Sequence, residues 1–79
     1  FARLARYADR ACLVSDTAIV QAVRYALDRL KLVVEPSGAA SLAWLLAQPA
    51  GSLDGPVVAV LSGGNIEWEG LRALLAGAA

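Results

Sequence analysis

The sequence predicts an α/β fold, namely part of a parallel-sheet, three-layer α/β domain with the order strand, helix, helix, strand, helix. Two short apolar runs, at residues 11–14 and 57–61, have the composition of buried strands. Helical segments separate them, and strands joined through helical crossovers pair in parallel within one sheet. Because two strands cannot complete such a sheet, we expect its other strands to lie outside these 79 residues.

The first strand and the first helix are expected on either side of Ser15. This residue ends the run at 11–14, and its side chain can accept a free amide of the following turn as an N-cap. From Thr17 to Lys31, apolar residues recur at spacings of three and four, which predicts an amphipathic helix. The single cysteine, Cys12, excludes an internal disulfide, and its apolar neighbours predict a buried, inert thiol.

Two further helices flank the second strand. Pro36 suits the first turn of a helix, and we expect that helix to run from about Ser37 to Gln48. It has little polar surface, so we expect it to be buried, and its small residues allow a backbone or a ligand to come close. A last helix is expected at residues 67–75, with Asn65 as its N-cap.

The composition indicates one small segment of a larger structure. Of the 79 residues, 58% are hydrophobic, whereas a typical globular domain has about 45–50%. Chains of this size bury only a modest share of their surface. We therefore expect the excess apolar surface to pack against more protein, and we interpret residues 1–79 as one C-terminal segment without an internal domain boundary.

Charge and hydropathy argue against several classes of partner. The formal net charge is zero and the basic residues are scattered, which disfavours nucleic acid. The longest apolar stretch, residues 38–47, is about half of a membrane span, so no membrane partner is expected. The chain has no signal-peptide pattern, and the expected location is the cytoplasm. With no histidine and one cysteine, no metal site is predicted.

Two motifs are candidates for binding. Ser62-Gly63-Gly64-Asn65 follows the second strand at its carboxyl end, where open α/β sheets bind ligands, and its glycines let the backbone approach a flat or anionic ligand. A plain glycine turn is the alternative. Glu35 precedes a buried helix, where a carboxylate is costly without hydrogen-bond donors. Helix capping and ligand binding both remain open for it.

Together the two motifs resemble a known family. Residues 33–40, VVEPSGAA, and 57–65, VVAVLSGGN, resemble the closing segment of the threonine dehydratase and serine racemase family, which are fold-type II pyridoxal-phosphate enzymes. Residues 8–16 also look like the strand and helix start that precede these motifs in the family. The resemblance implies that the chain is the C-terminal part of such an enzyme, with pyridoxal 5'-phosphate as cofactor.

The resemblance also implies individual roles. Ser62 matches a serine whose hydroxyl hydrogen-bonds the pyridine nitrogen of the cofactor. Gly63 and Gly64 would shape the turn beside the ring, Asn65 would help to fix that turn, and Glu35 would lie close to the ring. A neutral hydroxyl leaves the pyridine nitrogen largely unprotonated, so the ring is a weaker electron sink, which suits β-elimination from serine or threonine.

Three hypotheses about function stay open. The resemblance implies a lyase that removes the α-proton and the β-hydroxyl of a hydroxy amino acid and releases a 2-oxo acid and ammonia. Racemisation is an alternative, because it starts from the same proton loss. A non-catalytic α/β interaction module is another, with the apolar excess as its interface. The expected partners are a small amino-acid substrate, the remainder of the enzyme and further copies in a homo-oligomer.

We predict that the isolated chain is inactive. The family's Schiff-base lysine and glycine-rich phosphate loop are expected upstream, so no catalytic residue is predicted here. The only lysine, Lys31, ends an amphipathic helix and is not expected to bind the cofactor. An assay for the 2-oxo acid should detect no turnover by these 79 residues alone, and measurable dehydratase activity would contradict the assignment.

Overall fold

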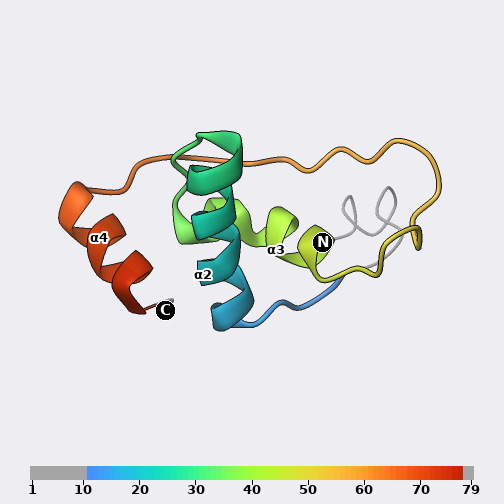
Figure 1. Cartoon of the computed structure of the whole chain (residues 1–79), viewed down its shortest axis with the longest axis horizontal. Helices are drawn as coiled ribbons and strands as arrows, with labels where there is room; N and C mark the ends of the chain where they lie inside the picture. Colours follow the sequence, from blue (N-terminus) through green and yellow to red (C-terminus); the bar gives the residue numbers. More distant parts are fainter. Residues whose placement is uncertain (1–10, 78–79) are drawn as a thin grey trace, which may run out of the picture.

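The computed structural model describes residues 11–77, and in this part the chain forms helices joined by extended segments (Figure 1). The helical elements are, in chain order, α2 (Asp16–Tyr25), the π-helical turn η1 (Ala26–Leu30), the 3-10 turn η2 (Pro36–Ala39), α3 (Ala40–Leu46) and α4 (Trp68–Gly77). The upstream residues 8–10, which contribute to the family resemblance, lie outside the described part. None of the helices in residues 11–77 has the length and apolar character that a membrane span requires.

The first helix begins where the sequence predicts it. Ser15 is extended, with φ −77° and ψ 157°, and its Oγ accepts the amide of Ala18 at 3.1 Å, which confirms the predicted N-cap. The helix continues through η1 and ends at Lys31, whose φ of 59° is left-handed. Such a conformation costs a non-glycine residue about 1 kcal/mol. The Lys31 Nζ donates to the carbonyl oxygen of Asp28 at 2.6 Å, in the last turn.

The second predicted helix is confirmed, but its ends and its burial differ from the prediction. It begins at Pro36, in a single 3-10 turn, and its α-helical part ends at Leu46, three residues before Pro49. Its small residues face the core, whereas Leu46 is 42% exposed. The expectation of a helix buried on all sides is therefore wrong for its far end.

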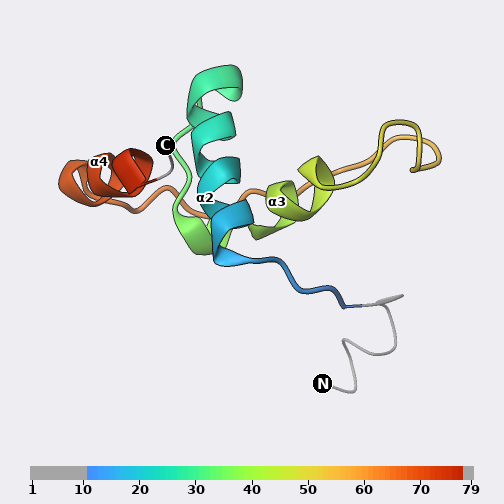
Figure 2. The same cartoon turned by 60° about the horizontal axis from the view of Figure 1, so that its bottom comes forward.

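The predicted strands are not paired with any other strand in residues 11–77. Residues 57–61 form part of an extended segment that passes α3 and α2 on its way to α4 (Figures 1 and 2). Val58 is 87% exposed and Val60 is 70% exposed. A strand needs neighbours on its edges to become part of a sheet, and the described segments supply none. The parallel α/β sheet remains a prediction.

Two local predictions are wrong. Cys12 was expected to be buried and is exposed, because no neighbouring strand covers its segment. Asn65 was expected to cap the last helix, but α4 begins at Trp68. The amide of Leu71 donates to the carbonyl oxygen of Glu67 at 2.9 Å, so Glu67 occupies the N-cap position.

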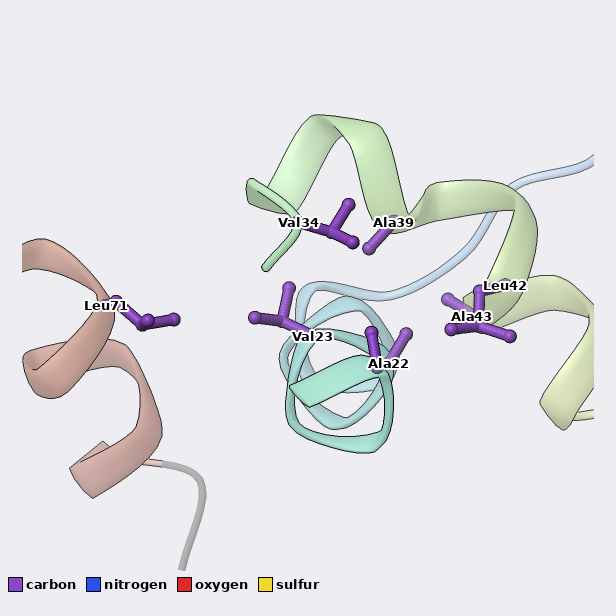
Figure 3. Packing of buried hydrophobic residues seen from close by; sticks show 8 residues of the cluster. Ala22, Val23, Val34, Ala39, Leu42, Ala43 and Leu71 are labelled. Atoms are coloured by element: carbon purple, nitrogen blue, oxygen red, sulfur yellow. The ribbon is translucent and has the colours of Figure 1, made fainter. Parts of the chain in front are cut away.

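The core is thin and is centred on α2, which lies between α3 and α4 (Figures 1 and 2). Val23 lies between Leu71 of α4 and the pair Val34 and Ala39, and Ala22 points toward α3 (Figure 3). The buried apolar residues are Ala22, Val23, Ala26, Val34, Ala39, Leu42, Ala43 and Leu71. Most of them are alanine or valine, so the core contains few large side chains.

The chain is more extended than a closed domain of its length. Its radius of gyration is 13.7 Å, against about 12 Å for a compact domain of similar length. Leu13 is fully exposed, and Val58 and Val60 are mostly exposed. These side chains form an apolar surface that no described residue covers, which is unusual for a monomeric soluble domain.

The N-cap of α2 gives a first prediction for the structure. Ser15→Ala removes the oxygen that accepts the Ala18 amide, and we expect the enzyme that contains this chain to lose about 1 kcal/mol of unfolding free energy. Ser15→Asp keeps an acceptor at this position and should retain the stability. Denaturant unfolding measures both, and equal stability of the alanine and aspartate variants would contradict the capping role.

Candidate functional site

The two predicted motifs lie side by side. Residues 33–41 and 60–64 run past each other in a contact that we call the glycine crossing. Their backbones exchange two hydrogen bonds. These join the Glu35 amide to the Gly63 carbonyl oxygen at 3.1 Å and the Ser62 amide to the Gly38 carbonyl oxygen at 3.3 Å. Each segment both donates and accepts one of these two backbone hydrogen bonds.

The segments of the crossing run in opposite directions. Gly64 lies beside Val33 at one end, because a Cβ on Gly64 would come within 2.6 Å of the Val33 carbonyl oxygen. Val60 lies beside Ser41 at the other end, where the Ser41 Oγ donates to the Val60 carbonyl oxygen at 2.6 Å. The residues predicted to bind a ligand therefore lie in and next to a single antiparallel contact.

Glycine at position 38 permits this approach. A Cβ on Gly38 would overlap the carbonyl oxygen of Ser62. That obstacle is backbone, which cannot turn aside as a flexible side chain can. The sequence predicts that small residues in this helix allow a backbone or a ligand to come close, and the group that comes close is the backbone of Ser62.

Gly63 is required for a different reason. Its φ is +85°, in the left-handed region that side chains rarely adopt, and a Cβ there would meet the carboxylate of Glu35. The positive φ is compatible with a plain glycine turn as well as with a binding motif. The motif is also in contact with the second motif, which a simple connecting turn does not require.

The carboxylate of Glu35 does not cap the helix that follows it. Glu35 occupies the N-cap position of η2, with φ −72° and ψ 158°, but its side chain accepts no capping hydrogen bond. The residue is half-buried, and its carboxylate lies against Gly63. Of the two roles that the sequence left open, the geometry disfavours capping and leaves the carboxylate at the crossing.

Ser62 is hydrogen-bonded within the crossing, whereas Asn65 lies outside it. Ser62 is exposed, so its side chain is not enclosed in a filled core, and its amide is fixed by Gly38. Asn65 is exposed beyond the end of the crossing, and no hydrogen bond joins its side chain to the part of the chain that the structure describes. Its predicted role beside the ring has no contact to support it.

The crossing carries a single charge. Glu35 is the only charged residue within residues 33–41 and 60–64. Phosphate groups are usually bound by cations or by helix N-termini with free amides. The crossing has no cation, so a phosphate there would have only backbone amides to bind it. It is better suited to an uncharged, flat group that needs one hydrogen bond and an unobstructed backbone.

Ser41 is the residue that sequence reasoning missed. Its hydroxyl makes the one hydrogen bond from a side chain within the crossing, among the residues described, and its partner Val60 lies 19 positions along the chain. A serine within an alanine- and leucine-rich helix gives no local signal of such a bond. Only the fold reveals it.

Comparison with known proteins identifies the family. A family described as "Pyridoxal-phosphate dependent enzyme" matches residues 1–63. The chain is 46% identical over 59 residues to an L-threonine ammonia-lyase of Geobacter sulfurreducens, covering 75% of this chain and 15% of that protein. It is 36% identical over 64 residues to an L-threo-3-hydroxyaspartate ammonia-lyase of a Pseudomonas species, covering 81% of this chain and 20% of that protein.

These matches confirm the family resemblance that the motifs predict. The chain spans a fifth or less of the length of these two relatives. The matched range includes Glu35, Gly38, Ser62 and Gly63 and ends before Gly64. No solved structure matches the chain.

The close approach at Gly38 gives a second structural prediction. Gly38→Ala forces the new Cβ against the Ser62 carbonyl oxygen, and we expect the enzyme to lose about 1–3 kcal/mol of unfolding free energy. Gly70→Ala is the matched control, because a Cβ there would lie 3.6 Å from the Ile66 side chain, an ordinary contact within helix α4. The control should be neutral or stabilising by up to about 1 kcal/mol.

Thermal or denaturant unfolding of both variants measures the difference. If Gly38→Ala were as stable as Gly70→Ala, the two backbones could not be as close as the structure places them.

Proposed function

The chain belongs to the family of pyridoxal-phosphate-dependent enzymes, and we propose that its glycine crossing forms the pyridine-nitrogen side of the cofactor site in an ammonia-lyase. The observation that carries this proposal is the crossing itself. It brings an exposed hydroxyl, at Ser62, into contact with a second motif that contributes a carboxylate, at Glu35. Pyridoxal phosphate supplies the electron-withdrawing ring on which the chemistry of this family depends.

The residues of the crossing fit the ring end of the cofactor. Gly63 and Gly64 have no side chains that could come between the backbone and a flat ring. Ser62 offers a hydroxyl, which can donate one hydrogen bond to a ring nitrogen. The crossing offers no cation to the phosphate end. We therefore assign the phosphate to residues outside this chain.

The hydroxyl of Ser62 determines the protonation of the nitrogen that it contacts. A serine hydroxyl is neutral, so it donates its proton in a hydrogen bond and leaves the ring nitrogen unprotonated. A carboxylate in its place would hold the proton on the nitrogen and make the ring a stronger electron sink. Ser62 thus favours the weaker sink, which suits loss of a β-hydroxyl.

Glu35 supplies the negative charge of the site. Its carboxylate lies against Gly63, next in the chain to Ser62, and no basic residue of the crossing neutralises it. A half-buried carboxylate of this kind gains from a hydrogen-bond donor. We propose that Glu35 lies beside the ring and accepts a hydrogen bond from the cofactor or the substrate.

The names of the relatives support elimination over racemisation. Both are ammonia-lyases, and both names specify a hydroxy amino acid. In the proposed reaction the substrate loses its α-proton and its β-hydroxyl, equivalent to one water. The released enamine then takes up water and hydrolyses to a 2-oxo acid and ammonia. The base that removes the proton lies outside this chain.

The remainder of the enzyme is the proposed protein partner of this segment. The exposed valines of residues 57–60 form the apolar surface that it would cover. A cytoplasmic homo-oligomer remains the expectation from the sequence.

The role of Ser62 can be tested by the visible absorption band of the bound cofactor. In the full-length enzyme, Ser62→Ala removes the hydrogen bond, and we expect about fivefold weaker cofactor affinity and a perturbed band. Ser62→Asp should hold the proton on the ring nitrogen, so the pH dependence of the band should change. Absorption titrations with pyridoxal phosphate measure both effects.

Ser52→Ala is a suitable control. The Ser52 Oγ donates to the carbonyl oxygen of Pro49 at 2.7 Å, in a loop outside the crossing. This variant should keep the wild-type band and affinity. A colourless wild-type protein, or a band that neither Ser62 substitution changes, would contradict the proposed function.

A further inference from the structure

We infer that Ser41 is a positioning residue that holds Ser62 at the cofactor ring. This inference rests on the proposed function and extends it to a residue of helix α3 that does not itself touch the ring. The link between the two serines is Val60, whose carbonyl oxygen accepts the Ser41 hydroxyl at 2.6 Å. Val60 lies two residues before Ser62, on the same extended segment.

Side-chain packing does little to hold the segment that leads to Ser62. Val58 is 87% exposed, Val60 is 70% exposed, and Ser62 is itself exposed. Only Ala59 and Leu61 are partly buried along this stretch. The position of the hydroxyl therefore depends mainly on the hydrogen bonds of the backbone.

Those hydrogen bonds act on both sides of Ser62. On the C-terminal side, the Glu35 amide donates to the Gly63 carbonyl oxygen at 3.1 Å. At Ser62 itself, the bond to Gly38 is long, at 3.3 Å. On the N-terminal side, the described residues provide the short hydrogen bond from the Ser41 hydroxyl to the Val60 carbonyl oxygen. Without it, the chain before Ser62 loses its hydrogen bond to α3 and keeps the packing of Leu61 against the core.

Ser41 is well placed to transmit the position of its helix. Its neighbours Leu42 and Ala43 are buried in the core, which fixes this turn of α3 against α2. Serine hydroxyls within helices commonly bond to a carbonyl of their own helix. The Ser41 hydroxyl bonds instead to another segment, so it contributes to tertiary structure and positions the backbone next to Ser62.

The test uses the full-length enzyme with pyridoxal phosphate and compares matched variants. Ser41→Ala removes the hydroxyl and leaves the backbone intact. Ser41→Thr keeps the hydroxyl, at a position that lines an open groove with Trp44 and Val58. Ser52→Ala removes a hydroxyl that also donates to a backbone carbonyl, at 2.7 Å, but away from Ser62.

We expect Ser41→Ala to perturb the visible band in the same direction as Ser62→Ala, and less strongly. Cofactor affinity should fall by about two- to fivefold, as for the loss of one hydrogen bond. The amide of Ser62 should exchange its hydrogen faster, a readout that does not depend on activity. Ser41→Thr should restore the wild-type band, and Ser52→Ala should not change it.

Two outcomes separate this inference from the proposed function. If Ser62→Ala changes the band but Ser41→Ala leaves band and amide exchange as in the wild type, Ser41 does not position Ser62, while the proposed function stands. If Ser62→Ala itself leaves the band unchanged, the proposed function and this inference both fail.

Discussion

The close approach of two backbones at the glycine crossing is the constraint on which the candidate site depends. Gly38 must lack a Cβ because the carbonyl oxygen of Ser62 occupies that space, and Gly64 must lack one because the carbonyl oxygen of Val33 lies near it. Close contact lets the two segments exchange hydrogen bonds directly. The position of Ser62 thus depends on these backbone hydrogen bonds together with the bond from the Ser41 hydroxyl to Val60.

The rest of the described chain supports this contact. Elements α3 and η2 pack against α2, and the buried side chains between them are mainly alanine and valine. The extended segment that carries Ser62 is hydrogen-bonded to Ser41 of α3 and to residues 35 and 38, which precede α3. Its own valines remain exposed, so the crossing is the place where this segment is held.

The helices could be predicted from the sequence because their signals are local. Spacings of three and four predicted the first helix, and Ser15 predicted its start. The strands could not be confirmed, because pairing requires neighbours that residues 11–77 do not supply. For the same reason, Cys12 is exposed. Asn65 has a residue type that commonly caps helices, yet the helix begins three residues later, at Trp68.

The motifs of the candidate site could be predicted from the sequence, but their arrangement in space could not. The residue types at 35 and 62–64 pointed to the family, and the comparisons confirmed it. The need for glycine at position 38 and the bond from Ser41 follow from contacts between residues about 20 positions apart. Nothing in local sequence records such contacts.

The protonation state of the cofactor's ring nitrogen tests the central claim most directly. Nitrogen-15 NMR of the full-length enzyme, loaded with ring-labelled pyridoxal phosphate, reports it. A neutral serine partner predicts the chemical shift of an unprotonated, hydrogen-bonded nitrogen. The shift of a pyridinium would contradict the account, since it would require an acidic group at the nitrogen in place of the hydroxyl.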